Sequence, residues 1–181
     1  MGLEVWAALA ALAVLAAAAW LYNRLVADRN LARQGFADID VQLKRRTDLV
    51  PQLVEAVRAY AAHEKALLTS VAEVRTAALA APRVAERFAH ERLLGERLEK
   101  LVLLQESYPA LKADTTFRDL AARLVEIEDQ LQYARRFYNG AVKQYVTRIE
   151  SFPDLLMAKA CGFRPMPFFE TAERAPVKVI V

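Results

Sequence analysis

Residues 36–78 read FADIDVQLKRRTDLVPQLVEAVRAYAAHEKALLTSVAEVRTAA, and the spacing of their apolar side chains decides the fold. Steps of three and four residues alternate along this stretch, and eleven of the thirteen positions that they select are apolar. This seven-residue period is typical of a helix that packs along one stripe. The stripe consists of Phe36, Ile39, Leu43, Arg46, Val50, Leu53, Val57, Tyr60, Glu64, Leu67, Val71, Val74 and Ala78. Continued backwards through Ala32, Arg29 and Leu25 it reaches Tyr22, so the period predicts one long helix from Tyr22 to Ala78.

Pro51 interrupts this predicted helix. A proline inside a helix removes one hydrogen bond and clashes with the carbonyl group four residues earlier. Asp48 is well placed to cap a new helix that tolerates Pro51 in its first turn. We therefore expect a kink or a short break between Thr47 and Pro51.

An uncharged segment precedes the heptads, from Val5 to Tyr22. Its 18 residues fall within the length that crosses a bilayer, which is about 17–25 residues, and Trp6 and Trp20 lie near its ends. No Lys or Arg precedes the segment, so residues 1–23 are expected to be an uncleaved anchor in contact with membrane lipid through residues 5–22, rather than a signal peptide. The basic residues after it predict that the rest of the chain is cytoplasmic and that the N-terminus lies outside. They include Arg24, Arg29 and Arg33.

Two more long helices are predicted after Pro82. The first runs from about Arg83 to Ser107, and the second runs from the capping residues around Thr116 to Glu150. A short helix is expected at Asp154–Ala160, followed by a docked loop at residues 163–169. The fold class is therefore all-α, with a transmembrane helix and an antiparallel bundle of three long helices and a short C-terminal helix. The bundle is assigned residues 24–169, and residues 170–181 a flexible tail.

Composition limits the possible functions. The 181 residues include 25 Lys and Arg against 22 Asp and Glu, which gives a net charge of only +3 and argues against binding to nucleic acid. The single Cys excludes an internally disulfide-bonded fold. Alanine-rich helical composition points to structure rather than to a reaction.

Charged residues occupy the predicted apolar stripes at Arg46 and Glu64 in residues 36–78, and at Arg148 in the helix that ends at Glu150. Buried charges require partners. We expect Arg46 to pair with Asp119, and Glu64 to pair with Arg135 or its neighbour Arg136. Such pairs serve either to set the register of the helices or to form a polar ligand site.

Known catalytic and metal-binding patterns fail at specific positions. An Asp-x-Asp start at Asp38 suggests a calcium loop, but Leu43 replaces the required glycine. His63-Glu64 begins a zinc-protease signature, but Leu67 replaces the second histidine. We therefore expect no enzymatic activity, no catalytic residues, no bound metal and no cofactor.

Several longer stretches carry a family resemblance. They are DIDVQLKRRTDLVPQLVEAVRAYAAHEK from Asp38, ESYPALKA from Glu106 and YARRFYNGAVKQYVTRIESFP from Tyr133. Together they resemble the LemA family, which implies a bacterial membrane protein with an N-terminal anchor and a long helical bundle. The resemblance implies no reaction. It singles out an interaction motif without an assigned role, formed by Asp38, Asp40, Gln42, Lys44, Arg45, Arg46, Asp48, Pro51, Tyr138 and Asn139.

The function expected from the sequence is a non-enzymatic helical scaffold, single-pass in the bacterial cytoplasmic membrane. It assembles with itself or with other membrane proteins. Two alternatives stay open, namely a signalling adaptor that docks other membrane proteins and a ligand-binding bundle with a polar site around Arg46 and Glu64.

Overall fold

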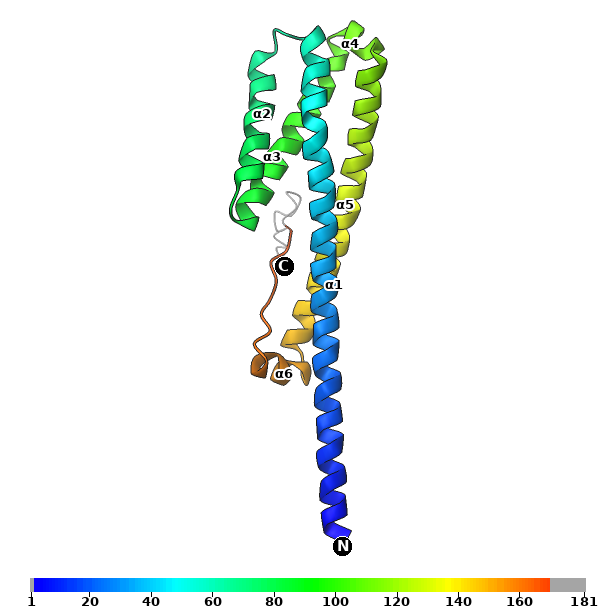
Figure 1. Ribbon diagram of the computed structural model, residues 1–181, viewed down its shortest axis with the longest axis vertical. Coiled ribbons are helices and arrows are strands. Elements are labelled where there is room, and N and C mark those ends of the chain that lie inside the picture. Colours follow the sequence, from blue (N-terminus) through cyan, green and yellow to red (C-terminus); the bar gives the residue numbers. More distant parts are fainter. Residues whose placement is uncertain (1, 170–181) are drawn as a thin grey trace, which may run out of the picture. The chain divides into compact units, whose positions relative to one another are not determined.

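The computed structural model describes residues 2–169, except for the side chains of residues 84 and 85, and the described chain is all-α as predicted (Figure 1). The predicted tail at residues 170–181 lies outside the described residues. The elements are α1 (Gly2–Tyr60), α2 (Lys65–Ala80), α3 (Val84–Leu103), a 3-10 turn η1 (Leu104–Glu106), α4 (Pro109–Ala113), α5 (Thr115–Glu150) and α6 (Asp154–Ala160).

These elements divide into two compact units. The central unit comprises residues 39–133, and the terminal unit comprises residues 2–38 and 134–169. Helices α1 and α5 each contribute to both units, since the boundaries fall within them.

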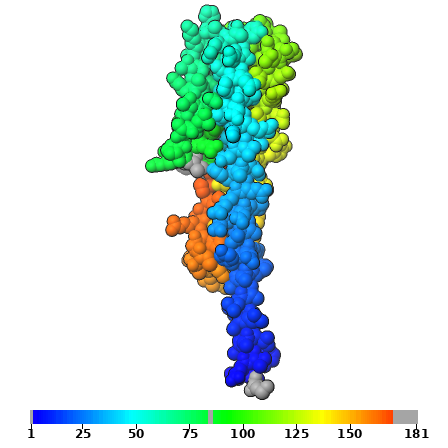
Figure 2. Space-filling view, in the orientation of Figure 1, coloured from blue at the N-terminus to red at the C-terminus, as the bar shows by residue number. Residues whose placement is uncertain are grey.

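Helix α1 begins with the apolar segment. This part of α1 is long and apolar enough to cross a membrane, and none of its most apolar window is buried by the rest of the chain. Figure 2 shows it as a bare dark-blue helix on the face in view. A helix that is apolar all round and uncovered suggests membrane anchoring.

The central unit is an up-down-up-down bundle of α1, α2, α3 and α5, in which α2 and α3 pack against each other on one side of α1 (Figure 1). One apolar core joins all of these helices and α4. Its fully buried members include Leu53, Val57, Val71, Leu94, Leu98, Leu101, Leu111 and Phe117.

The first long helix ends at Tyr60, whereas the apolar period predicted that it continues to Ala78. The chain turns at residues 61–64 and reverses into α2, although no Gly or Pro stands there. Contacts with the α3–α5 connection hold both sides of this turn. Tyr60 donates a hydrogen bond to Asp114 (2.9 Å), and Tyr108 donates one to Glu64 (3.0 Å). Tertiary contacts therefore override the local period here.

Helix α1 continues through Pro51, so the short break that the sequence allowed at this point is absent. The missing proline N–H leaves the carbonyl oxygen of Thr47 without its helical donor. The Nε atom of Arg75 on α2 donates to that oxygen at 2.9 Å. A side chain thus replaces the lost backbone hydrogen bond, and the helix continues.

The terminal unit joins α1, α5, α6 and the extended segment 163–169. A small apolar cluster of Leu25, Tyr145, Ile149 and Ala158 holds α6 against α1 and α5. Helix α6 has the bounds that the sequence predicted.

In this unit the buried stripe of α1 runs through Asp28 and Gly35 rather than through Arg29 and Phe36. The helices approach closely at Gly35, where an added Cβ atom would lie 3.1 Å from the Cα atom of Tyr138. Only glycine fits this contact without displacing α5.

Candidate interaction site

A buried arginine lies at the centre of the site. Arg46 on α1 is 1% exposed. Its Nη2 atom donates to the carboxylate and to the carbonyl oxygen of Glu91 on α3, each at 2.6 Å. Its Nη1 atom donates to the carboxylate of Glu128 on α5 at 2.7 Å. The guanidinium group therefore ties three helices of the central unit together.

Gly95 provides the space for this arginine. A Cβ atom at position 95 would lie 3.2 Å from the Nη1 atom of Arg46. Glycine inside a helix costs about 1 kcal/mol relative to alanine, so its presence in α3 needs a packing reason. The close approach of the guanidinium group supplies that reason.

The observed partners of the charged residues differ from those expected. Arg46 pairs with Glu91 and Glu128, and Asp119 is exposed. Glu64 accepts a hydrogen bond from Tyr108, and Arg135 stacks over the ring of Phe169 at 4.6 Å. The register of α5 against α1 brings Glu128, not Asp119, to the level of Arg46, and apolar periodicity does not specify that register.

A groove of about 450 Å³ lies beside Arg46. Its walls come from the first part of the interaction motif on α1, the end of α2 and the start of α3. They include Asp40, Val41, Lys44, Asp48, Leu79, Arg87 and Glu91. Asp40 pairs with Arg87 at 3.1 Å, whereas Lys44 and Asp48 are exposed. The groove therefore combines charges of both signs with the exposed apolar side chains of Val41 and Leu79.

This mixture of charged and apolar side chains suits a protein partner better than a metal ion. Within residues 2–169, no group of three His, Cys, Asp or Glu residues is arranged to hold a metal ion. The carboxylates of Asp40 and Glu91 are already paired with arginines. Alternating charges and apolar side chains on a shallow surface are typical of a protein interface, with an apolar centre and a polar rim.

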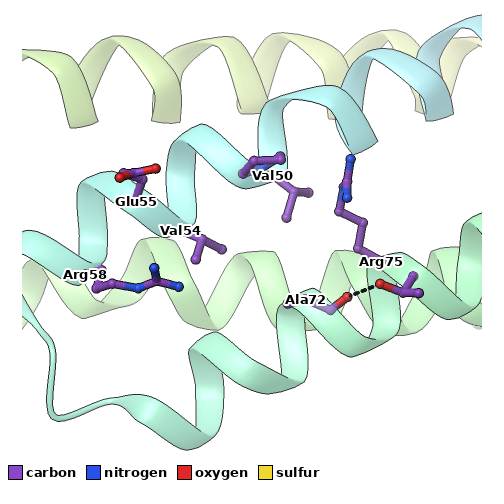
Figure 3. Close-up of a pocket in the computed structure, with 8 residues that line it drawn as sticks. Val50, Val54, Glu55, Arg58, Ala72 and Arg75 are labelled. Carbon is purple, nitrogen blue, oxygen red and sulfur yellow. Dashed lines mark hydrogen bonds between the residues drawn. The ribbon is translucent and has the colours of Figure 1, made fainter.

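The other motif residues have distinct positions. Arg45 donates a hydrogen bond to Gln42 at 3.2 Å, one turn away on the same helix, and both Asp38 and Arg45 are exposed. Pro51 lines a second groove between α1 and α2, of about 270 Å³. Figure 3 shows Val50 and Val54 on α1 above α2, with Arg58 and Arg75 at the two ends of this groove.

Tyr138 and Asn139 belong to the terminal unit and hold the segment 163–169. The side chain of Asn139 accepts from the N–H of Phe169 at 2.9 Å and donates to its carbonyl oxygen at 3.1 Å. Tyr138 donates to the carbonyl oxygen of Pro167 at 2.6 Å, and burial raises the pKa of this tyrosine. These two motif residues therefore fasten an extended segment to α5.

Sequence reasoning missed four residues that form polar contacts: Arg75, Glu91 and Glu128 in the central unit, and Asp28, which pairs with Arg148 in the terminal unit. Asp28 and Glu128 lie one position from the predicted stripes, and Glu91 stands on a helix whose apolar face was only loosely defined. For Arg75 the sequence does contain a signal. Pro51 lacks the N–H that would bond to the carbonyl oxygen of Thr47, so this oxygen needs a donor from another part of the chain.

The chain is similar to known proteins along most of its length. The sequence profile of the LemA family matches residues 35–180. Magnetosome protein MamQ 2 and magnetosome protein MamQ 1 of Paramagnetospirillum magneticum (strain ATCC 700264 / AMB-1) are each 23% identical over 204 residues, which cover 98% of this chain and 75% of the relative. Magnetosome protein MamQ of Magnetospirillum gryphiswaldense (strain DSM 6361 / JCM 21280 / NBRC 15271 / MSR-1) is 21% identical over 185 residues, covering 88% of this chain and 68% of the relative. The residues that form both grooves and the Arg46 network lie within the matched range, and the chain belongs to the LemA family.

Proposed function

We propose that this protein is a single-pass, membrane-anchored scaffold without enzymatic activity, which assembles with copies of itself through the groove beside Arg46. One observation carries the proposal: the same helix, α1, holds the uncovered apolar segment and most of the groove-forming motif. A protein built in this way displays an interaction surface on a membrane-bound helix.

The composition of the groove supports a protein partner. Val41 is 55% exposed and Leu79 is 63% exposed, and charged side chains surround them. Apolar side chains within a polar rim are the usual composition of interfaces between proteins. The ligand-binding alternative has less support, because protein groups already occupy both Nη atoms of Arg46, and because Glu64 bonds to Tyr108.

We further propose that the protein lies in the bacterial cytoplasmic membrane with its N-terminus outside. Arg24, Arg29 and Arg33 follow the apolar segment, and such basic residues favour the cytoplasmic side. Cys161 is exposed and is the one cysteine of the chain, so a membrane-impermeant thiol reagent tests the orientation. The reagent should label Cys161 in inverted membrane vesicles and not in intact spheroplasts. Labelling in spheroplasts alone would reverse the orientation.

Self-assembly is tested by the mass of the full-length protein in mild detergent, measured by light scattering after size exclusion. We expect a defined oligomer. Val41→Arg should dissociate it, because the substitution places a charge in the apolar part of the groove. Val125→Arg is the matched control, since Val125 is 59% exposed on α5 and does not line the groove.

Charge reversal at Lys44 and at Asp48 then tests the polar rim, whereas Arg46 is unsuitable because it is buried. Oligomers that survive Val41→Arg would contradict the groove as the interface. A monomeric parent would contradict self-assembly and favour the adaptor hypothesis, in which the groove binds another membrane protein. Capture of that protein from detergent-solubilised membranes, lost on Val41→Arg and kept on Val125→Arg, would then be expected.

A further inference from the structure

The corner between α5 and α6 in the terminal unit exposes large apolar side chains. Phe152 is 80% exposed, more than any other large apolar residue described beyond residue 22. Leu156, four residues later, is 62% exposed, although Asp154 and Ala158 on the opposite face of α6 are buried. Single exposed apolar residues are common and need no explanation. Two of this size within five residues, at the outer edge of a short helix, do need one.

This corner lies beside the end of the apolar segment. Leu25, three residues after Tyr22, packs in one cluster with Ala158 of α6. The ring of Tyr22 meets the ring of Phe163 edge to face, with centroids 5.9 Å apart. Figure 1 shows α6 next to α1 where the bare part of α1 begins. The helix that carries the exposed apolar side chains of the corner therefore lies next to the end of the apolar segment.

The charges around the corner favour a lipid surface with acidic headgroups. Arg24, Lys159 and Arg164 are exposed, and the guanidinium group of Arg24 stacks over the ring of Trp20 at 5.1 Å. Among the nearby acidic residues, Asp154 is buried and Glu150 is exposed. A tryptophan at the end of an apolar helix, with basic side chains beyond it, is the usual arrangement at the headgroup level of a bilayer.

We propose that residues 152–160 form a second membrane contact, in which Phe152 and Leu156 enter the headgroup region of the bilayer that α1 spans. The proposal rests on the membrane anchoring proposed above. A single spanning helix tilts and rotates freely within limits set by its flanking residues. A second contact on α6 restricts that motion and fixes which face of the terminal unit meets the membrane. Apolar side chains on a short amphipathic helix bind in this way at the depth of the headgroups.

The native Cys161 provides the reporter, because it is exposed directly after α6. We would label it with the environment-sensitive fluorophore NBD and reconstitute the full-length protein in vesicles of phosphatidylcholine and phosphatidylglycerol. Lipids spin-labelled near the headgroup then quench fluorophores at the membrane surface. The control is Ala37→Cys combined with Cys161→Ser, because the exposed residue 37 lies 15 residues beyond Tyr22 along α1, about 22 Å by the helical rise.

We expect blue-shifted emission and loss of most of the fluorescence at Cys161, and little change at residue 37. Leu156→Ser should reduce the quenching at Cys161, and Phe152→Ser should do the same. Val125→Ser is the matched control, since Val125 is 59% exposed in the central unit, does not line the groove and should leave the quenching unchanged. Because Phe152, Leu156 and Val125 are all exposed, circular dichroism should show that each variant folds like the parent.

Vesicle flotation and alkaline extraction separate this proposal from the anchoring on which it rests. Protein that floats, resists extraction and is quenched at Cys161 supports both. Protein that floats and resists extraction, but whose Cys161 fluorescence is equal to that of residue 37, overturns the second contact and leaves the anchor intact. Protein that does not float overturns both.

Discussion

The two units each bury one charged residue from α1, and they surround it differently. In the central unit, Arg46 is paired with Glu91 and Glu128 amid a core drawn from five helices. In the terminal unit, Asp28 is 7% exposed. It pairs with Arg148 at 2.5 Å and accepts a hydrogen bond from Gln144 at 2.9 Å, close to the apolar cluster of Leu25, Tyr145, Ile149 and Ala158.

The difference shows that the units depend on different interactions. Helix packing holds the central unit, and it encloses the ion pair of Arg46 with Glu91. Among the described residues, the terminal unit has fewer buried apolar side chains, and side chains of α5 fasten its extended segment by hydrogen bonds to the backbone. Damage to the core should therefore unfold the central unit as a whole, whereas damage to the terminal unit should remain local.

Removing Arg46 should have the largest effect. Arg46→Met leaves the 3%-exposed carboxylate of Glu91 without its cation, and breaking a buried pair in this way costs about 3–5 kcal/mol. The free energy of unfolding of the full-length protein in detergent, from urea titration followed by circular dichroism, measures this loss.

The double variant Arg46→Met with Glu91→Leu is the control, because it removes both charges and should recover much of the stability. Asp28→Asn should cost less than Arg46→Met, since Arg148 is 15% exposed and retains access to water. Equal losses for Arg46→Met and Asp28→Asn would refute the contrast between the units.

Gly35 tests the close approach of α1 and α5 in the terminal unit. Gly35→Ala places a methyl group 2.9 Å from the Phe137 ring and 3.1 Å from the Tyr138 backbone, and such overpacking costs about 1–3 kcal/mol. Hydrogen exchange at peptide resolution should show the loss in residues 134–169 and not in α2 and α3.

Gly140 on α5 is the matched control, because an added Cβ atom there meets nothing within 4 Å. Gly140→Ala should stabilise α5 by up to about 1 kcal/mol through helix propensity. Stabilisation by Gly35→Ala as well would show that the helices are not in close contact at that point.

The fold class, the bounds of α6 and the end of α5 follow from local sequence, because periodicity and caps act over a few residues. The turn after Tyr60 does not follow, since residues 61–64 carry no breaker and the turn depends on Asp114 and Tyr108, more than 40 residues away. The candidate site likewise has a part that the local sequence predicts and a part that depends on distant contacts. The stripe showed that Arg46 is buried, but the identity of its partners depends on the register of α3 and α5 against α1. The hydrogen bonds of Asn139 could not be predicted, because their partner is the backbone of Phe169, 30 residues away in an extended segment.

Arg75 supplies the hydrogen bond that Pro51 cannot make, so the effects of mutating these two residues on stability should be coupled. Arg75→Ala leaves the Thr47 carbonyl oxygen without a donor, which costs about 1–2 kcal/mol. In a Pro51→Ala background the restored N–H supplies the donor, so Arg75→Ala should cost clearly less. Urea titration of the four proteins of this double-mutant cycle measures the coupling. Equal costs in both backgrounds would mean that Arg75 does not compensate for Pro51.

Substitution of Asn139 tests whether damage to the terminal unit stays local. Asn139→Ala removes both hydrogen bonds to Phe169 and should cost about 1 kcal/mol, confined to the segment 163–169. Faster hydrogen exchange and faster proteolysis of that segment, with unchanged exchange in the central unit, are the expected readouts. Tyr133→Ala is the control, because Tyr133 is 66% exposed on the same helix. Global destabilisation by Asn139→Ala would contradict the local role of this contact.

The smallest effect is a pH dependence at Asp114, where the central unit joins α4 to α5. The backbone N–H of Phe117 donates to its carboxylate at 2.6 Å, and the hydroxyl of Tyr60 donates at 2.9 Å. The first of these bonds, and then the second, lowers the pKa of Asp114 below its ordinary value. A carboxyl group with a lower pKa in the folded protein stabilises the folded state above the unfolded-state pKa, and this stability is lost as the pH falls through the folded-state pKa.

The urea midpoint of unfolding should therefore fall less between pH 7 and pH 3 in Asp114→Asn than in the parent, and Tyr60→Phe should lie between them. Because Asp114 caps the first turn of α5, the acid-sensitive part should appear in hydrogen exchange of the central unit, and an identical acid slope in all three proteins would contradict this assignment.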